Sequence, residues 1–270
     1  VYQLGNNKLV QIADVELPDA QLPVKGMGDW ALVSTSKPYS LSSMWEGRTR
    51  SDYYKVSLAT GERTLIAKAD YAGYRLSPAG KYVGTYNATD SCWYTINLAD
   101  NRKIQLTTPQ TFPAWDEDND VPNYPSPHGM AGWTKDDAAL LIYDRYDIWS
   151  FDPEGKKAPV RLTKDGREKQ VTYRRIVLDR EQMDIDLKEP MLMTGFNEVD
   201  KSTAVYRSRL IAPATPTLLA GGNFNYDNVM KAKNADKYIY SKENFEVFPD
   251  VWVADANFKK NLQLTQGIRQ

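Results

Sequence analysis

The sequence contains one cysteine and one histidine in its 270 residues. The single cysteine, Cys92, excludes an internal disulfide and a cysteine-based metal cluster, and we expect it to be a small buried side chain. The single histidine, His128, is the one candidate for the base of a serine-histidine-carboxylate triad, and we expect it to face solvent in a loop. No Gly-x-Ser-x-Gly turn, which exposes the serine of an α/β-hydrolase, occurs in the sequence. We therefore predict that these residues by themselves form no enzyme.

The chain also has little excess of either charge and no long apolar run. Lys and Arg number 34 against 35 Asp and Glu, which gives a net charge of −1. Such a balance provides no electrostatic attraction for nucleic acid or an anionic membrane. No apolar stretch approaches the roughly 18 to 20 residues that span a bilayer, and no signal peptide is visible. We predict no nucleic-acid partner and no membrane partner.

Short strand-like runs between turn residues make up most of the sequence. In residues 133–163, apolar or aromatic runs at 140–143, 148–151 and 160–162 are separated by clusters that contain Asp, Pro or Gly. Such runs of about four residues between turn residues are typical of hairpins. One further strand in front would complete a four-stranded antiparallel sheet.

This pattern recurs five times along the chain. The centre of the second strand repeats at intervals of 47 to 58 residues, at Leu32, Val83, Leu141, Leu192 and Ile239. An aromatic residue marks the third strand of each copy, at Tyr54, Trp93, Trp149, Tyr206 and Trp252. A leucine follows after 11 to 13 residues, at Leu65, Leu106, Leu162, Leu218 and Leu264. This order predicts an all-β fold, a β-propeller with the aromatic markers in its core, because each sheet must stack on its neighbours to bury both faces.

We predict a single propeller domain over residues 1–270. Its blades are expected at residues 22–67, 71–107, 128–163, 172–219 and 225–265, after a half blade at 1–13. The last copy already has its own fourth strand, so it leaves no gap for the half blade to fill. We therefore expect about five and a half blades cut from a larger propeller.

Two long excursions interrupt the regular spacing, at residues 34–52 and 108–128. In an antiparallel blade, the connections that carry them emerge on the same side, so both are expected on one face. Long loops on a rigid scaffold commonly carry binding residues. The candidates for peptide binding, by stacking and by pairing with a carboxylate, are Trp45, Arg48, Arg50, Trp115, Asp116 and Asp118. The alternative is that these side chains pin the loops to the rim or pack on a further domain.

The acidic run at Asp116, Asp118 and Asp120 begins like a calcium-binding loop. An EF-hand loop has glycine at its sixth position and glutamate at its twelfth, where this sequence has Val121 and Pro127. The run is therefore expected to be a solvated acidic loop. We predict neither a metal nor a cofactor.

Three stretches resemble the propeller of a known protein family. They are Leu-Ser-Pro-Ala-Gly-Lys-Tyr-Val at 76–83, Trp-Thr-Lys-Asp-Asp-Ala-Ala-Leu-Leu-Ile-Tyr-Asp-Arg-Tyr-Asp-Ile-Trp at 133–149, and Phe-Pro-Asp-Val-Trp-Val-Ala-Asp at 248–255 followed by Gln-Leu-Thr. The family is that of bacterial prolyl oligopeptidase serine peptidases, which includes dipeptidyl-peptidase-like enzymes. The resemblance covers essentially the whole chain, although Ser-Pro-x-Gly-Lys hairpins are shared with TolB-like propellers.

The resemblance implies a parent serine peptidase that hydrolyses peptide bonds. In that family, an α/β-hydrolase domain follows the propeller and holds the triad, while the propeller covers the active site and gates peptide substrates. An acidic pair in an Asp-Trp-x-Tyr-Glu-Glu context usually anchors the substrate amino terminus of dipeptidyl peptidases, and this sequence lacks it. No anchoring residue is therefore assigned. Such bacterial enzymes are often exported, which favours a periplasmic or extracellular location.

Two other functional classes are compatible with a propeller. The first is a free-standing module of the TolB or WD40 type that binds a protein partner. The second is a glycosidase, which would need carboxylates on the innermost strands of several blades. Those strands, expected near 71–76, 128–133, 172–179 and 225–231, carry at most one carboxylate each. The sequence therefore favours the peptidase propeller, with the binding module as the alternative.

Overall fold

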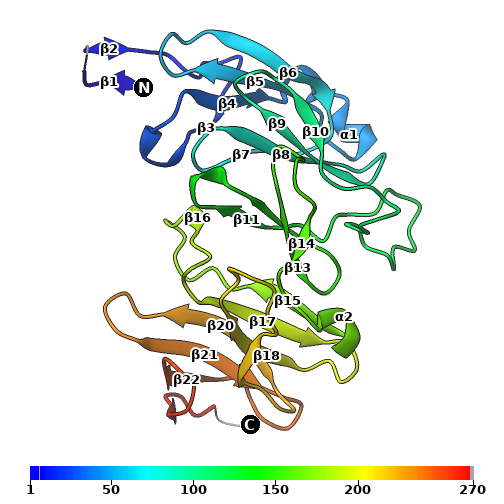
Figure 1. The fold of residues 1–270 in the computed structure, drawn as a ribbon, viewed down its shortest axis with the longest axis vertical. Coiled ribbons are helices and arrows are strands. Elements are labelled where there is room, and N and C mark those ends of the chain that lie inside the picture. The colour runs from blue at the N-terminus through cyan, green and yellow to red at the C-terminus, as the bar shows by residue number, and fades with distance from the viewer. Residues whose placement is uncertain (6, 268–270) are drawn as a thin grey trace. The chain divides into compact units, whose positions relative to one another are not determined.

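The computed structural model describes residues 1–5 and 7–267. β-Strands dominate these residues, and the helical segments are short (Figure 1). The helical segments have three or four residues each: η1 (Val24–Gly26), η2 (Lys37–Tyr39), α1 (Ser43–Glu46), η3 (Lys135–Asp137) and α2 (Gly166–Lys169). Within the described residues, no helix has the length and apolar character needed to cross a membrane.

The chain divides into two compact units. The first unit comprises Val1–Leu141, Phe151–Pro159 and Met183–Ile185. The second unit comprises Ile142–Ser150, Val160–Gln182 and Asp186–Gln270. Each unit has its own sheets and is described in turn.

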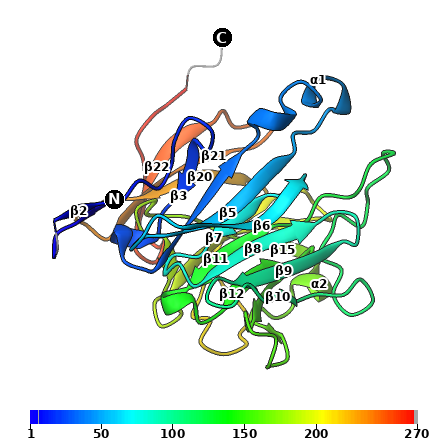
Figure 2. The same cartoon turned by 90° about the horizontal axis from the view of Figure 1, so that it is seen from above.

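The first unit contains two complete four-stranded antiparallel sheets. One has the order β3-β4-β5-β6, with β3 (Asp19–Gln21), β4 (Trp30–Thr35), β5 (Ser51–Ser57) and β6 (Arg63–Asp70). The other has the order β7-β8-β9-β10, with β7 (Tyr74–Leu76), β8 (Tyr82–Asn87), β9 (Cys92–Asn97) and β10 (Lys103–Gln105). In Figure 2, which is seen from above, the labelled strands of these two sheets overlap one another.

Alternating side chains of β4 explain how the first sheet buries both of its faces. Ala31 and Val33 belong to a buried cluster that also contains Val10, from the segment before the sheet. Leu32, between them, packs in a second buried cluster with Val83 of the neighbouring sheet. Successive side chains of a strand point to opposite faces, so the continuous apolar run of β4 places its residues in both cores.

The predicted half blade at the N-terminus corresponds to a short hairpin. Its strands are β1 (Tyr2–Gln3) and β2 (Lys8–Leu9), which pair antiparallel with Tyr2 opposite Leu9. Val10 and Ile12, which follow the hairpin, are buried against the first sheet. The amino-terminal segment therefore covers one face of that sheet.

A buried lysine links the two sheets of the first unit. Lys55 lies on β5 and is 5% exposed. Its Nζ donates a hydrogen bond to the carbonyl oxygen of Leu98 at 2.7 Å and lies 4.2 Å from the centre of the Trp30 ring. Burial lowers the pKa of Lys55, because removal from water disfavours the charged form. The hydrogen bond and the ring offset part of that cost.

The Ser-Pro-Ala-Gly-Lys turn at residues 77–81 is held by a buried carboxylate. Asp137 is 2% exposed. Its Oδ2 accepts a hydrogen bond from the Ser77 hydroxyl at 2.5 Å, and its Oδ1 accepts one from the Ala79 backbone N–H at 2.9 Å. The turn is therefore fixed by tertiary hydrogen bonds as well as by its own proline and glycine.

The boundary between the two units lies within the third group of strands. This group comprises β11 (Met130–Thr134), β12 (Leu140–Tyr143), β13 (Ile148–Phe151) and β14 (Val160–Arg161). In the first unit, β11 pairs in parallel with β16 (Asp184–Ile185), so that Trp133 lies opposite Asp184. In the second unit, β13 pairs antiparallel with β14. The parallel strand β16 was not predicted by the sequence pattern.

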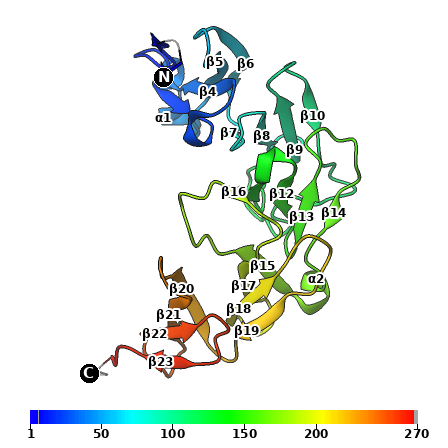
Figure 3. The same cartoon turned by 60° about the vertical axis from the view of Figure 1, so that its left-hand side comes forward.

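The second unit contains two further four-stranded antiparallel sheets (Figure 3). One has the order β15-β17-β18-β19, with β15 (Val171–Arg175), β17 (Met191–Asn197), β18 (Thr203–Ser208) and β19 (Thr217–Ala220). The other has the order β20-β21-β22-β23, with β20 (Asn225–Lys231), β21 (Lys237–Glu243), β22 (Asp250–Asp255) and β23 (Asn261–Gln263). The core that both sheets share contains Leu192, Val205, Tyr226, Tyr238, Tyr240, Ala254 and Phe258.

A buried carboxylate also organises the start of the second unit. The side chain of Asp147 is 0% exposed and lies 2.7 Å from Nη2 of Arg161. Its Oδ1 also accepts a hydrogen bond from the Thr163 hydroxyl at 2.8 Å. Both oxygens of Glu168 accept hydrogen bonds from the same guanidinium, at 3.0 and 2.6 Å. Arg161 therefore bridges a buried carboxylate and an exposed one.

These sheets confirm the predicted all-β fold built from four-stranded antiparallel blades. The aromatic marker Trp93 is 4% exposed, and Tyr54 and Trp252 pack against buried clusters. These three markers lie in the cores, as expected. The number of blades and their predicted boundaries remain predictions.

Candidate functional site

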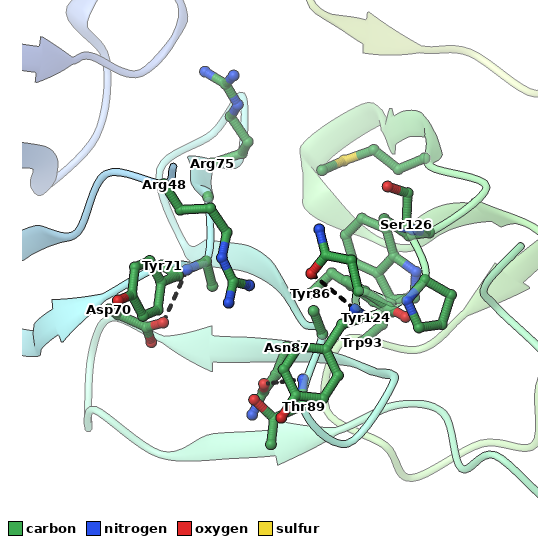
Figure 4. Close-up of a pocket in the computed structure, with 17 residues that line it drawn as sticks. Arg48, Asp70, Tyr71, Arg75, Tyr86, Asn87, Thr89, Trp93, Tyr124 and Ser126 are labelled. Atoms are coloured by element: carbon green, nitrogen blue, oxygen red, sulfur yellow. Dashed lines mark hydrogen bonds between the residues drawn. The ribbon is translucent and has the colours of Figure 1, made fainter. Parts of the chain in front are cut away.

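A pocket of about 670 Å³ opens within the first unit (Figure 4). Pockets that hold small ligands commonly measure roughly 300 to 1,000 Å³. Four segments line it: Arg48 after α1, the turn from β6 into β7, the β8–β9 hairpin, and residues 123–127 with Met130. The pocket therefore draws on both long excursions, which the sequence placed on one face.

The first excursion is fixed to the β6–β7 turn by a compact polar network. Glu46 accepts a hydrogen bond from Nη2 of Arg50 at 2.8 Å and another from the Tyr71 hydroxyl at 3.0 Å. The Tyr71 hydroxyl in turn accepts a hydrogen bond from Nε of Arg50 at 2.8 Å. Gly47 ends α1 with a φ of 67°, a left-handed conformation that glycine adopts without strain. This turn allows the chain to leave α1 toward Arg48.

Arg48 connects the two excursions through aromatic rings. Its guanidinium carbon lies 4.7 Å from the centre of the Tyr71 ring and 5.9 Å from that of Tyr124. These distances are within the range of cation–π attraction, and Figure 4 shows the guanidinium between the two rings. Across residues 1–5 and 7–267, no hydrogen bond or ion pair engages the Arg48 side chain.

The second excursion forms a narrow finger with a closed base. Trp115 and Pro127 form an isolated antiparallel bridge, and the backbone N–H of Asp116 donates to the carbonyl oxygen of Ser126 at 2.8 Å. Phe112 anchors the base, since its ring meets that of Phe151 edge-on with centroids 5.1 Å apart. Tyr124 follows the tip of the finger on its returning side, close to the base, and lines the pocket.

The pocket wall carries three formal charges, from Arg48, Arg75 and Asp70. Both oxygens of Asp70 already accept hydrogen bonds, from the Ala72 N–H at 2.9 Å and from the Tyr74 hydroxyl at 2.8 Å. Burial and this carboxylate raise the pKa of Tyr74, so its hydroxyl stays a donor. The lining therefore has a net charge of +1, and its carboxylate is already satisfied.

Aromatic and apolar side chains form the rest of the pocket. Trp93 and Tyr86 are 4% and 8% exposed, and their ring centroids lie 5.5 Å apart. Met130, Pro125 and Pro127 complete this surface. The site thus combines an apolar wall with one positive charge at its edge.

The six residues predicted for peptide binding occupy different positions. Arg48 lines the pocket, whereas the ion pair between Arg50 and Glu46 makes Arg50 part of the supporting network. Trp45 is 75% exposed on α1. Trp115 is half-buried at the base of the finger, and Asp116 and Asp118 are exposed there. The assignment of all six to substrate binding remains a prediction.

Sequence reasoning missed Tyr71 and Tyr124, the two rings beside Arg48. Tyr71 lies in a short turn between two strands, and a turn of ordinary length does not indicate a binding residue. Tyr124 lies in the second excursion between two prolines, at Pro-Asn-Tyr-Pro-Ser-Pro. An exposed aromatic residue among prolines in a long loop was the available indication.

The cysteine and the histidine hold structural positions. Cys92 is 1% exposed, as predicted, and burial raises the pKa of its thiol, which disfavours the reactive thiolate. His128 is half-buried and its ring Nε2 is shielded from solvent, so the expectation that it faces solvent was wrong. Its backbone N–H donates to the carbonyl oxygen of Ala114 at 3.0 Å, which draws the histidine into the base of the finger.

The acidic run at Asp116, Asp118 and Asp120 shows no metal-binding arrangement. Oδ1 of Asp116 accepts a hydrogen bond from the backbone N–H of Asp118 at 3.1 Å, which is an ordinary turn contact. In the described part of the chain, no group of three or more His, Cys, Asp or Glu side chains has a geometry that would hold a metal ion.

Comparison with known proteins shows similarity in structure but not in sequence. No protein-family model matches the chain, and no curated protein matches it. The structure is similar to dipeptidyl peptidase 4 from Porphyromonas gingivalis, with a TM-score of 0.58 and 13% identity over 98% of this chain and 43% of that chain. A structure from a study of two prolyl endopeptidases gives a TM-score of 0.51 and 11% identity over 93% of this chain and 36% of that one. TolB from Acinetobacter baumannii gives a TM-score of 0.44 and 13% identity over 93% of this chain and 55% of that one.

The two peptidase structures support the propeller fold. The chain spans less than half the length of either peptidase. At these identities the likeness establishes the fold alone, because one fold hosts many functions.

Proposed function

We propose that this chain is the non-catalytic propeller of a serine peptidase. In this proposal, the propeller covers the active site of an α/β-hydrolase domain in the same parent chain and gates the access of peptide substrates. The observation that carries it is the match to dipeptidyl peptidase 4, which extends over 98% of this chain but 43% of the peptidase. The same relation recurs with a prolyl endopeptidase.

The chemistry of the chain supports a division of labour between domains. A serine peptidase needs a serine, a histidine and a carboxylate in contact. The single histidine, His128, is half-buried at the base of the finger, and the sequence has no Gly-x-Ser-x-Gly turn. The catalytic groups would therefore come from another domain, while the pocket around Arg48 is available for binding.

The first test is to read the parent gene beyond Gln270. A Gly-x-Ser-x-Gly motif within about the next 200 residues, followed by an aspartate and a histidine in that order, is the expected result. An open reading frame that ends without such a motif would contradict the proposal.

The second test measures activity. The isolated chain should not hydrolyse a chromogenic dipeptide anilide, and turnover that a serine-directed reagent blocks would contradict the proposal. The parent protein should cleave a short peptide and spare the same sequence inside a folded domain. Equal cleavage of both substrates would argue against gating.

A further inference from the structure

The pocket of the first unit has the features of a specific ligand site. We propose that it binds the carboxylate group of a peptide through the guanidinium of Arg48. The proposal concerns binding by the pocket itself and holds whether or not the proposed peptidase function is correct.

The surroundings of Arg48 leave its hydrogen-bonding capacity open. The rings of Tyr71 and Tyr124 lie 4.7 and 5.9 Å from the guanidinium carbon. A guanidinium held over aromatic rings keeps its N–H groups directed outward in its own plane. Because no described residue accepts from those groups, the two parallel hydrogen bonds that a carboxylate forms with arginine are available.

A second arginine of the same excursion, Arg50, has a guanidinium whose N–H groups already have hydrogen-bond acceptors. Arg50 stands two residues further along, and its Nη2 lies 2.8 Å from Oε1 of Glu46. Its Nε donates to the Tyr71 hydroxyl at 2.8 Å. Within residues 1–5 and 7–267, a carboxylate pairs with Arg50 and none pairs with Arg48, although both arginines contact Tyr71.

The charge of the pocket fits a singly charged group. Arg48 and Arg75 contribute two positive charges, and Asp70 contributes one negative charge. Figure 4 shows the guanidinium of Arg75 directed away from that of Arg48, so one guanidinium faces a ligand between the rings. Phosphate groups are usually bound by clusters of arginines. One available guanidinium and a net charge of +1 therefore favour a carboxylate.

The rest of the lining favours a peptide as the bearer of that carboxylate. The buried rings of Trp93 and Tyr86 lie beside Met130, Pro125 and Pro127. Apolar and aromatic walls with one oriented charge are typical of sites that bind a side chain next to a charged group. The carboxylate can belong to a peptide C-terminus or to an acidic side chain.

The experiment compares three peptides by isothermal titration calorimetry on the whole chain. The probes are Ala-Ala-Pro-Phe with a free carboxylate, the same peptide with a C-terminal amide, and Ala-Ala-Pro-Glu with a C-terminal amide. A charge-assisted hydrogen-bonded pair predicts that a carboxylate peptide binds about tenfold tighter than Ala-Ala-Pro-Phe amide. The tighter of the two carboxylate peptides identifies the source of the group.

Three variants assign the binding to Arg48. Arg48→Gln should weaken binding of the carboxylate peptide about tenfold and leave the amide peptide unchanged. Arg48→Lys should not restore it, because an ammonium keeps the charge but lacks the planar fork. Arg209→Gln, the same change at an exposed arginine outside the pocket, is the matched control and should bind like the unsubstituted chain. Thermal unfolding of each variant verifies that it is folded.

Several results would overturn the proposal. They are equal affinity for the acid and amide peptides, equal behaviour of the Arg48→Gln and Arg209→Gln variants, and the absence of binding by either carboxylate peptide at about 1 mM. Displacement of the peptide by inorganic phosphate at lower concentration than by acetate would also overturn it, because the site would then prefer phosphate.

Discussion

Two arginines, one in each unit, are used in different ways. Arg161 of the second unit lies 2.7 Å from the buried Asp147 and 2.6 Å from Glu168. Arg48 of the first unit lies over the rings of Tyr71 and Tyr124 and has no carboxylate partner among the described residues. The same side chain is thus a structural anchor in one unit and an available donor in the other.

The difference lies in what each guanidinium contributes to stability. Removing the buried member of a charge pair is strongly destabilising, because the donors that it satisfied lose their partner inside the protein. An exposed cation over aromatic rings contributes only about 0.5 to 1 kcal/mol. Arg161 should therefore matter for folding, and Arg48 should matter for binding.

The largest effect is expected on removing the buried partner of Arg161. Asp147→Ala should lower the free energy of unfolding by about 3 kcal/mol, because it strips hydrogen bonds from Arg161 and from Thr163. The value is at the low end of its range, since Glu168 still pairs with the guanidinium. Denaturant unfolding measures the change, with Asp236→Ala, an exposed aspartate, as the control. Equal stability of the two variants would show that the pairing of Arg161 with Asp147 contributes little to folding, and the proposed difference in role between Arg161 and Arg48 would be wrong.

A buried cation of the first unit provides an intermediate case. Lys55→Met should lower the free energy of unfolding by about 1 to 2 kcal/mol, because the carbonyl oxygen of Leu98 loses its donor. Removal of a buried charge offsets part of this loss. Lys68→Met, on the exposed part of β6, is the control in the same denaturation experiment. A more stable Lys55→Met variant would show that desolvation of the lysine outweighs its contacts.

The sequence predicted the sheets well because their pattern is local and repeated. The marker Trp93 is buried, as a strand centre between two stacked sheets should be. The leucine markers predict the position of a strand but not always its burial. Leu162 is 3% exposed, whereas Leu65 and Leu218, on the last strands of their sheets, are 47% and 54% exposed. The parallel pairing of β16 with β11 could not be predicted, because β16 has two residues and its partner is distant in sequence.

The candidate site was predictable in part. Loop length identified the excursion that contains Arg48, because long loops on a regular scaffold stand out in the spacing. Composition did not distinguish Arg48 from Arg50, since the difference depends on Glu46, which lies four residues before Arg50 at the end of α1 and pairs with it. Tyr71 was missed because its turn has ordinary length. Which of two neighbouring arginines pairs with a carboxylate is decided by the tertiary structure, so the sequence alone does not show it.

A smaller effect is expected at Tyr71, whose ring and hydroxyl have separate roles. Tyr71→Phe removes the hydroxyl contacts with Glu46 and Arg50 and should lower the free energy of unfolding by about 1 kcal/mol. Because the ring under Arg48 remains, carboxylate-peptide binding should change less than about twofold. Tyr71→Leu removes the ring as well and should weaken binding about threefold, in line with an exposed cation–π contact. Calorimetry that finds equal binding losses for both variants would show that the ring has no special role.

The smallest effect is expected from pH at the exposed partner of Arg161. The hydrogen bonds from Arg161 hold the pKa of Glu168 at about 2, below its ordinary value of 4.5. A carboxyl with a lowered folded pKa adds stability above its unfolded pKa and loses that stability as pH falls through the folded value. Unfolding midpoints measured from pH 6 to pH 2 should therefore fall more for the unsubstituted chain than for Glu168→Gln, and the two should converge near pH 2.

The control is Glu189→Gln, a change at an exposed glutamate that forms no ion pair with Arg161. This variant should follow the unsubstituted chain. Parallel curves for Glu168→Gln and the unsubstituted chain would mean that the ion pair with Glu168 adds no stability and that Asp147 alone anchors Arg161. The exposed edge of the Arg161 guanidinium would then resemble that of Arg48, which has no carboxylate partner among the described residues.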